Sequence, residues 1–193
     1  MLKTLLFLGA LAAAPSMGAT ITYTVALSGL NESPVNASAG IGNGTVIFDT
    51  TANTMAINLT FSGLTGTTTA SHIHAATAVP FTGTAGVATQ TPTFAGFPLG
   101  VTSGSYTQTF DLTQVASFNA AYYSANGGTS AGATAALEAA AAAGTAYLNV
   151  HTTAFPGGEI RGFLTLQTPE PGTFGMFGCA MAAAALLRRK LRS

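Results

Sequence analysis

The middle of the chain consists of short stretches in which hydrophobic and polar residues alternate. Within residues 20–30, the odd-numbered positions from Ile21 to Leu27 are hydrophobic, and the even-numbered positions between them are threonine or alanine. A period of two is typical of a β-strand with one buried face. The same signal predicts a hairpin over 44–64 and further strands at 70–75, 105–112, 145–152 and 159–166.

Two stretches break this alternation. Residues 131–144 are rich in alanine and end at a glycine, which predicts a capped helix, and residues 113–128 predict a shorter helical turn. The glycine-rich stretch 40–45 predicts a turn, and residues 76–104 form a long loop without a regular pattern. We therefore expect one all-β domain over residues 20–168, an antiparallel sandwich or barrel with one or two short helices inserted.

The first 19 residues have a different composition. They contain one basic residue, Lys3, then a hydrophobic run from Leu5 to Ala14, then small residues. This order is typical of a secretory signal peptide and is too short for a membrane-spanning helix. We expect cleavage between Ser16 and Thr20. An ordinary buried N-terminal helix is the alternative.

The C-terminal segment, residues 169–193, combines a hydrophobic stretch with a basic end. Residues 172–187 carry no charge and are followed by four basic residues. As a helix, this stretch would extend about 24 Å, and arginine side chains that reach the headgroups make up much of the difference from a ~30 Å hydrocarbon core. The basic end would stay in the cytoplasm, which places the domain outside. The alternative, an amphipathic core helix, needs a polar face, and this stretch has none.

Three parts of this segment follow one another in a specific order. Pro169-Glu170-Pro171, the hydrophobic stretch and the end that begins with Arg188 and Arg189 resemble the PEP-CTERM sorting signal of bacterial exported proteins. The resemblance implies recognition by a membrane-embedded exosortase and cleavage near Pro169–Pro171. It also implies a protein exported to the cell surface or beyond, with its tail initially in the inner membrane, in a bacterium that makes extracellular polysaccharide.

Charge and cysteine content narrow the function classes. Residues 20–168 contain five acidic residues and one basic residue, Arg161, which gives a net charge of 1 − 5 = −4. Binding to nucleic acid requires cations against phosphate, so this class is excluded. The single cysteine, Cys179, lies in the C-terminal segment, so no disulfide stabilises the domain.

All three histidines of the chain lie on predicted strands. His72 and His74 point the same way because one residue separates them, and His151 lies on the face opposite to Leu148 and Val150. The Cα atoms of such a pair are about 6.6–6.8 Å apart, so two imidazoles can bind one ion, and a third completes a set that suits copper or zinc. Spacing does not show that the two strands are neighbours. Unpaired histidines on the surface are the alternative.

These histidines belong to a longer pattern. The HIH at 72–74, LSGLNESP at 27–34 and YLNVHT with GGEIRG between 147 and 162 resemble the CHRD domain, named after chordin, through residues 21–167. The resemblance implies a β-sandwich of extracellular and bacterial secreted proteins, without an established general activity. The histidines also resemble part of the copper site of Cu/Zn superoxide dismutase, which implies His72, His74 and His151 as copper ligands. That enzyme's bridging histidine and zinc ligands have no match.

Near the end of the domain, Glu159 and Arg161 alternate with Ile160 and so share one face of a predicted strand. A buried arginine without a partner is costly, so we expect a structural ion pair in which Glu159 or Glu32 binds Arg161. The alternative is an arginine that draws an anionic substrate toward a metal.

The sequence contains no Ser/His/Asp arrangement, carboxylate pair or nucleophile motif typical of a hydrolase. The primary hypothesis is therefore a surface-sorted β-sandwich module that binds a polysaccharide or protein matrix partner without catalysis. The second hypothesis is an extracellular copper or zinc protein with a three-histidine site, which stores the ion or is redox-active.

Overall fold

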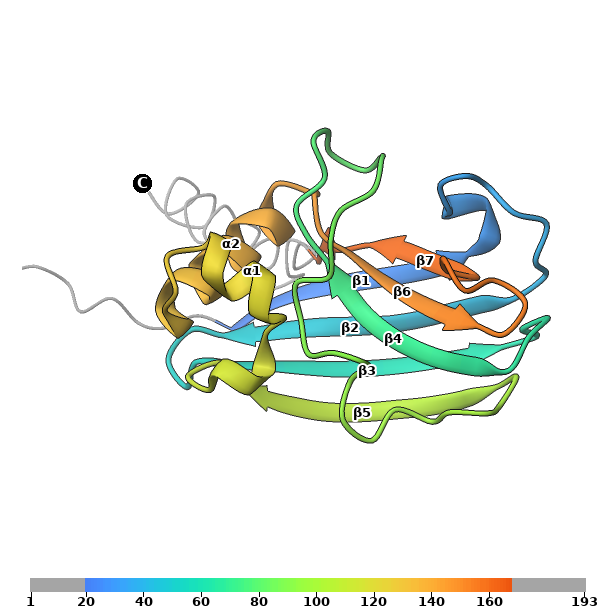
Figure 1. The fold of residues 1–193 in the computed structure, drawn as a ribbon, viewed down its shortest axis with the longest axis horizontal. Helices are drawn as coiled ribbons and strands as arrows, with labels where there is room; N and C mark the ends of the chain where they lie inside the picture. Colours follow the sequence, from blue (N-terminus) through green and yellow to red (C-terminus); the bar gives the residue numbers. More distant parts are fainter. Residues whose placement is uncertain (1–19, 168–193) are drawn as a thin grey trace, which may run out of the picture.

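The computed structural model describes residues 20–167 (Figure 1). The predicted signal peptide, the sorting signal and the hydrophobic segment lie outside these residues. The strands are β1 (Thr20–Ser28), β2 (Ile41–Asp49), β3 (Thr54–Ser62), β4 (Thr68–His74), β5 (Gly104–Asp111), β6 (Tyr147–Thr152), β7 (Ile160–Phe163) and β8 (Thr165–Leu166). The helices are α1 (Ala120–Ala125) and α2 (Ser130–Ala142), with short 3-10 turns at Gly29–Asn31 and Val115–Ser117.

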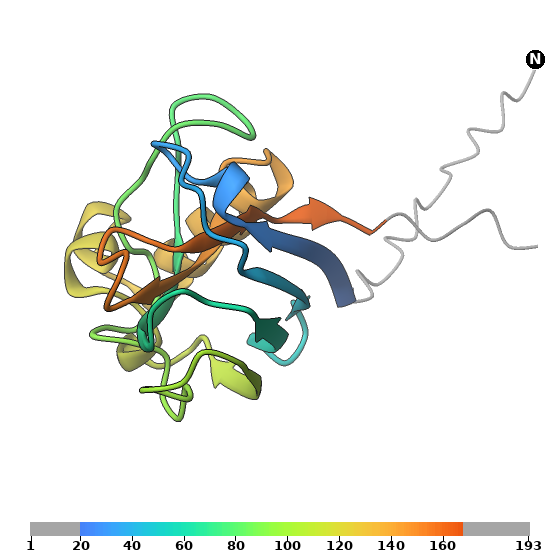
Figure 2. The same ribbon diagram turned by 90° about the vertical axis from the view of Figure 1, so that its right-hand side faces the viewer.

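The strands form a single curled antiparallel sheet, a half-barrel, in the order β4-β6-β7-β1-β2-β3-β5, and β8 also pairs with β1. Figure 2 looks along the strands and shows this arc. Sequence analysis predicted a sandwich or a barrel, and the described strands form neither two separate sheets nor a closed ring. The strands β7 and β1 are joined through one residue pair, Ser28 with Arg161, and β8 adds two pairs with β1, so the two parts of the sheet meet at a short seam.

The hydrophobic core lies on the concave side of the half-barrel and follows the predicted alternation. Ile73, Leu148 and Val150 are fully buried, as expected from their positions on β4 and β6. The predicted strand over 159–166 is split at Leu164, whose N–H donates to the carbonyl of Ala146 instead of a sheet partner. The side-chain directions that sequence analysis assigned to these strands are confirmed.

Both predicted helices are present, at one end of the half-barrel (Figure 1). The helix α2 begins where the side chain of Thr129 accepts a hydrogen bond from the N–H of Gly132, which caps its first turn. It is followed by Gly144, which has a φ of +69° that a glycine adopts without strain. Its buried side consists of alanines, Thr134 and Leu137, and Leu137 joins the core of the sheet.

The glycine-rich stretch 40–45 is not a turn, contrary to the prediction, because β2 begins at Ile41. Gly42 lies opposite Leu27 of β1 and Phe61 of β3. A Cβ on Gly42 would lie 3.3 Å from side-chain atoms of both Leu27 and Ile160. The glycine is therefore a strand residue that makes room for larger neighbours in the core.

The long loop between β4 and β5 runs along the free edge of β4. The N–H groups of Ala88 and Phe94 donate to the carbonyls of Ile73 and Ser71, and the Thr89 hydroxyl accepts from the N–H of Ile73. These bonds satisfy backbone groups that an uncovered edge strand would leave open. The loop is thereby held against the strand that carries His72 and His74.

Candidate metal centre

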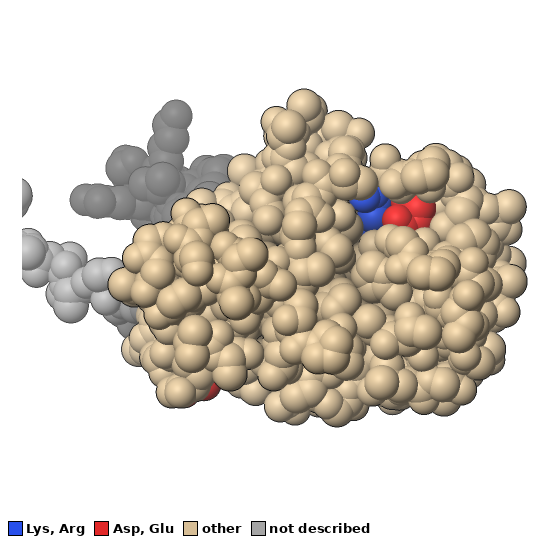
Figure 3. Space-filling model, in the orientation of Figure 1, with Lys and Arg blue, Asp and Glu red and all other residues tan. Residues whose placement is uncertain are grey.

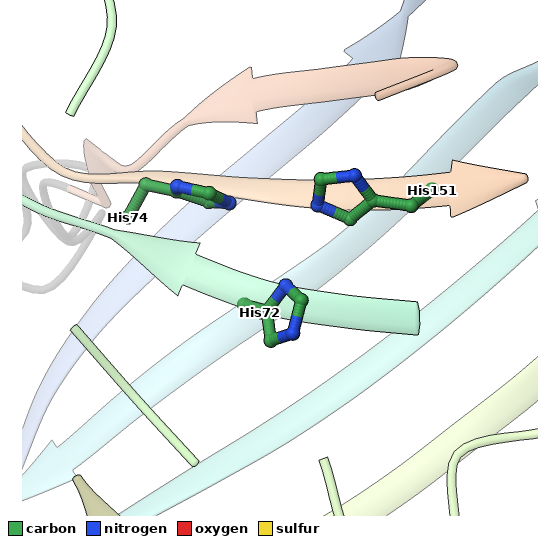
Figure 4. Close-up of side chains that lie close together, drawn as sticks. All are labelled: His72, His74 and His151. Carbon is green, nitrogen blue, oxygen red and sulfur yellow. The ribbon is translucent and has the colours of Figure 1, made fainter. Parts of the chain in front are cut away.

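The three histidines meet because β4 and β6 are hydrogen-bonded neighbours. His72 lies opposite Asn149 and His74 opposite Tyr147, which places His151 diagonally across from His72. Figure 4 shows the three side chains on the same face of these two strands. Their ring centroids lie 5.1 to 5.7 Å apart, and one nitrogen from each ring lies within 4.8 Å of the others. The structure thus shows that the two strands are neighbours, which the spacing of the histidines in the sequence did not determine.

The histidines point away from the hydrophobic core, as predicted, but they are not surface residues. His72 is 6% exposed, His74 is 8% exposed and His151 is half-buried. The loop between β4 and β5 contacts His72 and His74 through its backbone carbonyls. The alternative of three unpaired histidines on the surface is therefore wrong for these two residues.

One nitrogen of each ring is hydrogen-bonded to a backbone carbonyl. The distances are 2.6 Å from His72 Nε2 to Pro92 O, 3.0 Å from His74 Nδ1 to Ala85 O, and 2.9 Å from His151 Nδ1 to Pro156 O. A carbonyl only accepts, so each of these nitrogens carries the proton and the other nitrogen carries a lone pair. Those other nitrogens, His72 Nδ1, His74 Nε2 and His151 Nε2, are buried and have no hydrogen-bond partner.

Burial keeps the three imidazoles neutral. Desolvation lowers the pKa of all three histidines, and that of His74 falls to about 4, further lowered by the neighbouring His151, His72 and Arg161. The carbonyl hydrogen bonds favour the charged form, but they do not outweigh the desolvation. At neutral pH the site therefore presents the form of histidine that binds metal ions.

The spacing of the lone pairs fits a metal ion after a small contraction. An ion at the centre of a triangle whose edges are at most 4.8 Å lies at most about 2.8 Å from each corner, so each nitrogen must move inward by no more than about 0.7 Å to reach a bond length of 2.0–2.1 Å. Small rotations of the rings supply such a shift. The donor set, three neutral imidazoles with polarised outer nitrogens, suits copper or zinc.

An aromatic ring supports one side of this site. Tyr147 lies parallel to His74, with 4.8 Å between the ring centroids. The Tyr147 hydroxyl lies 3.2 Å from the N–H of Ala85, the residue whose carbonyl also accepts from His74. The guanidinium of Arg161 lies over the Tyr147 ring, with its Cζ 4.6 Å from the centroid. His74, Tyr147 and Arg161 thus form one stack.

The family model of the CHRD domain matches residues 23–164. The chain belongs to the CHRD family. All three histidines lie within the matched residues, as do Glu32, Glu159 and Arg161. No curated protein and no solved structure matches the chain.

In this CHRD domain the ion pair joins Arg161 to Glu32, with 3.7 Å between Arg161 Nε and Glu32 Oε2. Arg161 also donates to the carbonyls of Asn31 and Gly83. Burial raises the pKa of Glu32 to about 7, although Arg161 acts in the opposite direction. Arg161 is the only Lys or Arg in the described chain. The blue atoms in the hollow of Figure 3, next to red acidic atoms, therefore belong to Arg161.

Glu159 has a different role in the CHRD domain and does not contact Arg161 in any hydrogen bond or ion pair of the described residues. Its fully buried carboxylate accepts hydrogen bonds from the hydroxyls of Ser38 and Thr152 and from the N–H groups of Thr65 and Gly66. Desolvation opposes its ionisation, but these donors outweigh it and lower the pKa of Glu159. Glu159 thus ties the loops at Ser38 and at Thr65–Gly66 to Thr152, the residue next to His151.

Two further residues beside the histidines, Tyr147 and Asn149, were not assigned a role from the sequence. Both alternate with Leu148 and Val150 on β6 and therefore share a face with His151, a signal that was available. The accepting carbonyls of Pro92, Ala85 and Pro156 had no such signal, because every residue has a carbonyl.

Proposed function

We propose that this CHRD domain binds one copper or zinc ion through His72, His74 and His151. Each ring has one buried nitrogen without a hydrogen-bond partner, and one nitrogen from each ring lies within 4.8 Å of the others; together these observations carry the proposal. Unpaired buried polar atoms are costly, and a cluster of three is explained by a ligand that they share. When bound, copper would be stored or exchange electrons there, and zinc would be held without redox chemistry.

The surrounding residues have defined roles in this proposal. The carbonyls of Pro92, Ala85 and Pro156 hold the proton on the outer nitrogen of each ring, which keeps the inner nitrogen free to bind. Tyr147 keeps the ring of His74 in its plane, and Glu159 ties the loops beside His151 to the sheet. No described residue supplies a nucleophile or general base in this arrangement, so the proposal is ion binding rather than hydrolysis.

Metal analysis of the purified chain tests the proposal. The chain is offered Zn(II), Cu(II) and copper with ascorbate, passed through a desalting column and analysed for metal. We expect one equivalent of at least one ion, and loss of uptake in His74→Gln and His151→Gln. The matched control is Asn58→Ala on the exposed face of β3, which should keep full uptake. A folded chain that takes up none of these ions contradicts the proposal.

The primary hypothesis from the sequence, binding to a matrix partner, is supported by a separate observation. The outer face of β1, β2, β3 and β5 carries small uncharged polar residues that line up across the strands. One row consists of Thr24, Thr45, Asn58 and Thr107. A shallow hollow of about 230 Å³ lies over three members of this row, Thr45, Asn58 and Thr107. Hydroxyls and amides both donate and accept hydrogen bonds, which suits an uncharged polysaccharide.

This second candidate is tested by co-sedimentation with an insoluble neutral polysaccharide such as cellulose. Thr45→Glu with Thr107→Glu places charge in the row and should abolish retention, whereas Thr51→Glu, in the turn between β2 and β3, should not. Equal retention of both variants, or no retention of the unmodified chain on any neutral polysaccharide, contradicts this role.

We further propose that the protein is exported and then sorted by an exosortase through residues 169–193, as the motif around Pro169–Pro171 and Arg188 suggests. No helix among residues 20–167 is long and apolar enough to cross a membrane. Deletion of residues 169–193 should release the protein into the medium with the domain folded. Retention of the truncated protein at the cell surface contradicts the sorting proposal.

A further inference from the structure

The ligand set of the proposed metal centre carries no negative charge. Among the described residues, the group that gathers there consists of three histidines, without a carboxylate or a thiolate. Two buried acids of the domain are engaged elsewhere: Glu159 accepts from Ser38 and Thr152, and Glu32 pairs with Arg161 through Oε2, while its Oε1 has no hydrogen-bond partner. The ligands would therefore not neutralise any of the charge of a bound ion.

The surroundings add positive rather than negative charge. The outer nitrogens of the histidines donate to neutral carbonyls and not to carboxylates, which would have made the imidazoles more basic. The ring of Tyr147 separates His74 from the guanidinium of Arg161, the single Lys or Arg in the described chain. These contacts make a doubly charged ion less favourable at the site than a singly charged one.

The penalty for a buried ion rises with the square of its charge. Moving a divalent ion out of water therefore costs about four times as much as moving a monovalent ion of the same size. Cu(II) and Zn(II) usually offset this cost with carboxylate or thiolate ligands or with bound water. Here the three imidazoles bring no negative charge, so a divalent ion would depend on bound water for this compensation, whereas a monovalent ion needs much less of it.

We infer that the site takes copper in the monovalent, cuprous form in preference to Cu(II) and Zn(II), an inference that rests on the proposed metal-binding function. Cu(I) has a filled d shell and accepts trigonal coordination, so three imidazoles complete its ligand set. The small contraction that the nitrogens require brings them toward such a triangle. The ion would arrive and leave as Cu(I), without a change of oxidation state.

Competition titrations of the full chain measure this preference. Cys179 is replaced by alanine, because a thiolate binds Cu(I) on its own. Cu(I) affinity is measured anaerobically against bathocuproine disulfonate, and Cu(II) and Zn(II) affinities against EDTA. We expect a dissociation constant for Cu(I) about a thousandfold below that for either divalent ion. Equal or tighter binding of a divalent ion overturns the inference but keeps the metal site. Absence of binding by all three overturns both.

An isosteric substitution tests the physical reason for the preference. Asn149 is 2% exposed, lies opposite His72 across the two strands, and its Oδ1 has no hydrogen-bond partner. Asn149→Asp places a negative charge beside the ligands and should reduce the Cu(I) preference over Cu(II) at least about tenfold. Asn58→Asp, the same change on the exposed face of β3, should leave it unaltered.

An unchanged ratio in a folded Asn149→Asp variant overturns the electrostatic reason for the preference. Circular dichroism of both variants establishes that they fold. If Asn149→Asp does not fold, the ratio measured for the unmodified site decides, since a value near one overturns the inference without any variant.

Discussion

The rings of Tyr147 and His74 are parallel to within 2°, and their centroids lie 4.8 Å apart. The two residues face each other across β6 and β4, and both contact Ala85, Tyr147 through its hydroxyl and His74 through Nδ1. The ring of His74 is thus held on one face by an aromatic surface and at one edge by a carbonyl. A residue held in this way needs little reorganisation to bind an ion.

Substitution of Tyr147 should therefore weaken metal binding without unfolding the domain. Tyr147→Leu removes the stack, which is worth about 1 kcal/mol, and should raise the dissociation constant for copper about fivefold. Tyr147→Phe keeps the ring and should have a smaller effect. Copper titration of both variants provides the check, and an equal loss in the two would assign the effect to the hydroxyl instead of the stack.

The metal-free protein should lose stability through His74 as the medium becomes acidic. The folded pKa of His74, about 4, is below the ordinary value of 6.5, so the unfolded chain binds this proton first. This destabilisation by His74 is absent above pH 6.5. It grows as the pH falls toward 4, where it reduces the free energy of unfolding by about 3 kcal/mol. Glu32, whose folded pKa is raised to about 7, acts in the opposite sense over part of this window.

The difference between the unmodified chain and His74→Gln isolates the contribution of His74, because Glu32 is common to both. Denaturant unfolding at several pH values should show the variant gaining relative stability between pH 6.5 and 4. A difference that stays constant over this range would show that burial does not keep His74 neutral.

Glu159→Gln should destabilise the domain strongly. The carboxylate accepts four hydrogen bonds in a fully buried position, and an amide replaces one acceptor oxygen with a donor that faces the N–H group of either Thr65 or Gly66. We expect a loss of about 3 kcal/mol in the free energy of unfolding. Glu138→Gln makes the same change on α2, where the structure describes no hydrogen bond to the carboxylate, and should cost much less. A similar loss of stability in both variants would contradict the proposed role of the Glu159 hydrogen bonds.

Two adjacent glycines offer a matched test of the packing beside the site. Gly158 has a φ of +132°, and a Cβ there would lie within 2.8 Å of side-chain atoms of Asn149 and Glu32. Gly158→Ala should therefore destabilise the domain by more than about 2 kcal/mol and weaken metal binding. Gly157→Ala has open space and should change neither property. Thermal unfolding and copper titration of the pair compare them directly.

Strand alternation was sufficient to predict which way the histidines point. Ile73, between His72 and His74, and Leu148 and Val150, before His151, are buried in the core, so the parity argument is confirmed. The same argument could not predict that β4 and β6 are neighbours, because pairing depends on the whole sheet. Nor could it predict the cover over His72 and His74, since the loop contacts them through carbonyls that every sequence provides.

The partner of Arg161 shows a second limit of sequence reasoning. Glu159 shares strand parity with Arg161, and Glu32 is distant in the sequence, so either acid was a reasonable partner. The structure places Glu32 beside the guanidinium because Asn31, its neighbour, accepts a hydrogen bond from Arg161. Glu159 instead meets the hydroxyl of Thr152 and two N–H groups of the loop after β3. The partner of Arg161 therefore depends on loop residues that come together only in the folded chain.

X-ray absorption of the copper-loaded chain, with Cys179 replaced by alanine, tests the central claim most directly. The proposed centre predicts a shell of about three nitrogen scatterers at roughly 2.0–2.1 Å, with the outer-shell pattern of imidazole rings. That pattern should disappear in His151→Gln. A shell made only of oxygen or sulfur, or an imidazole pattern that persists at full strength in His151→Gln, would contradict the three-histidine centre.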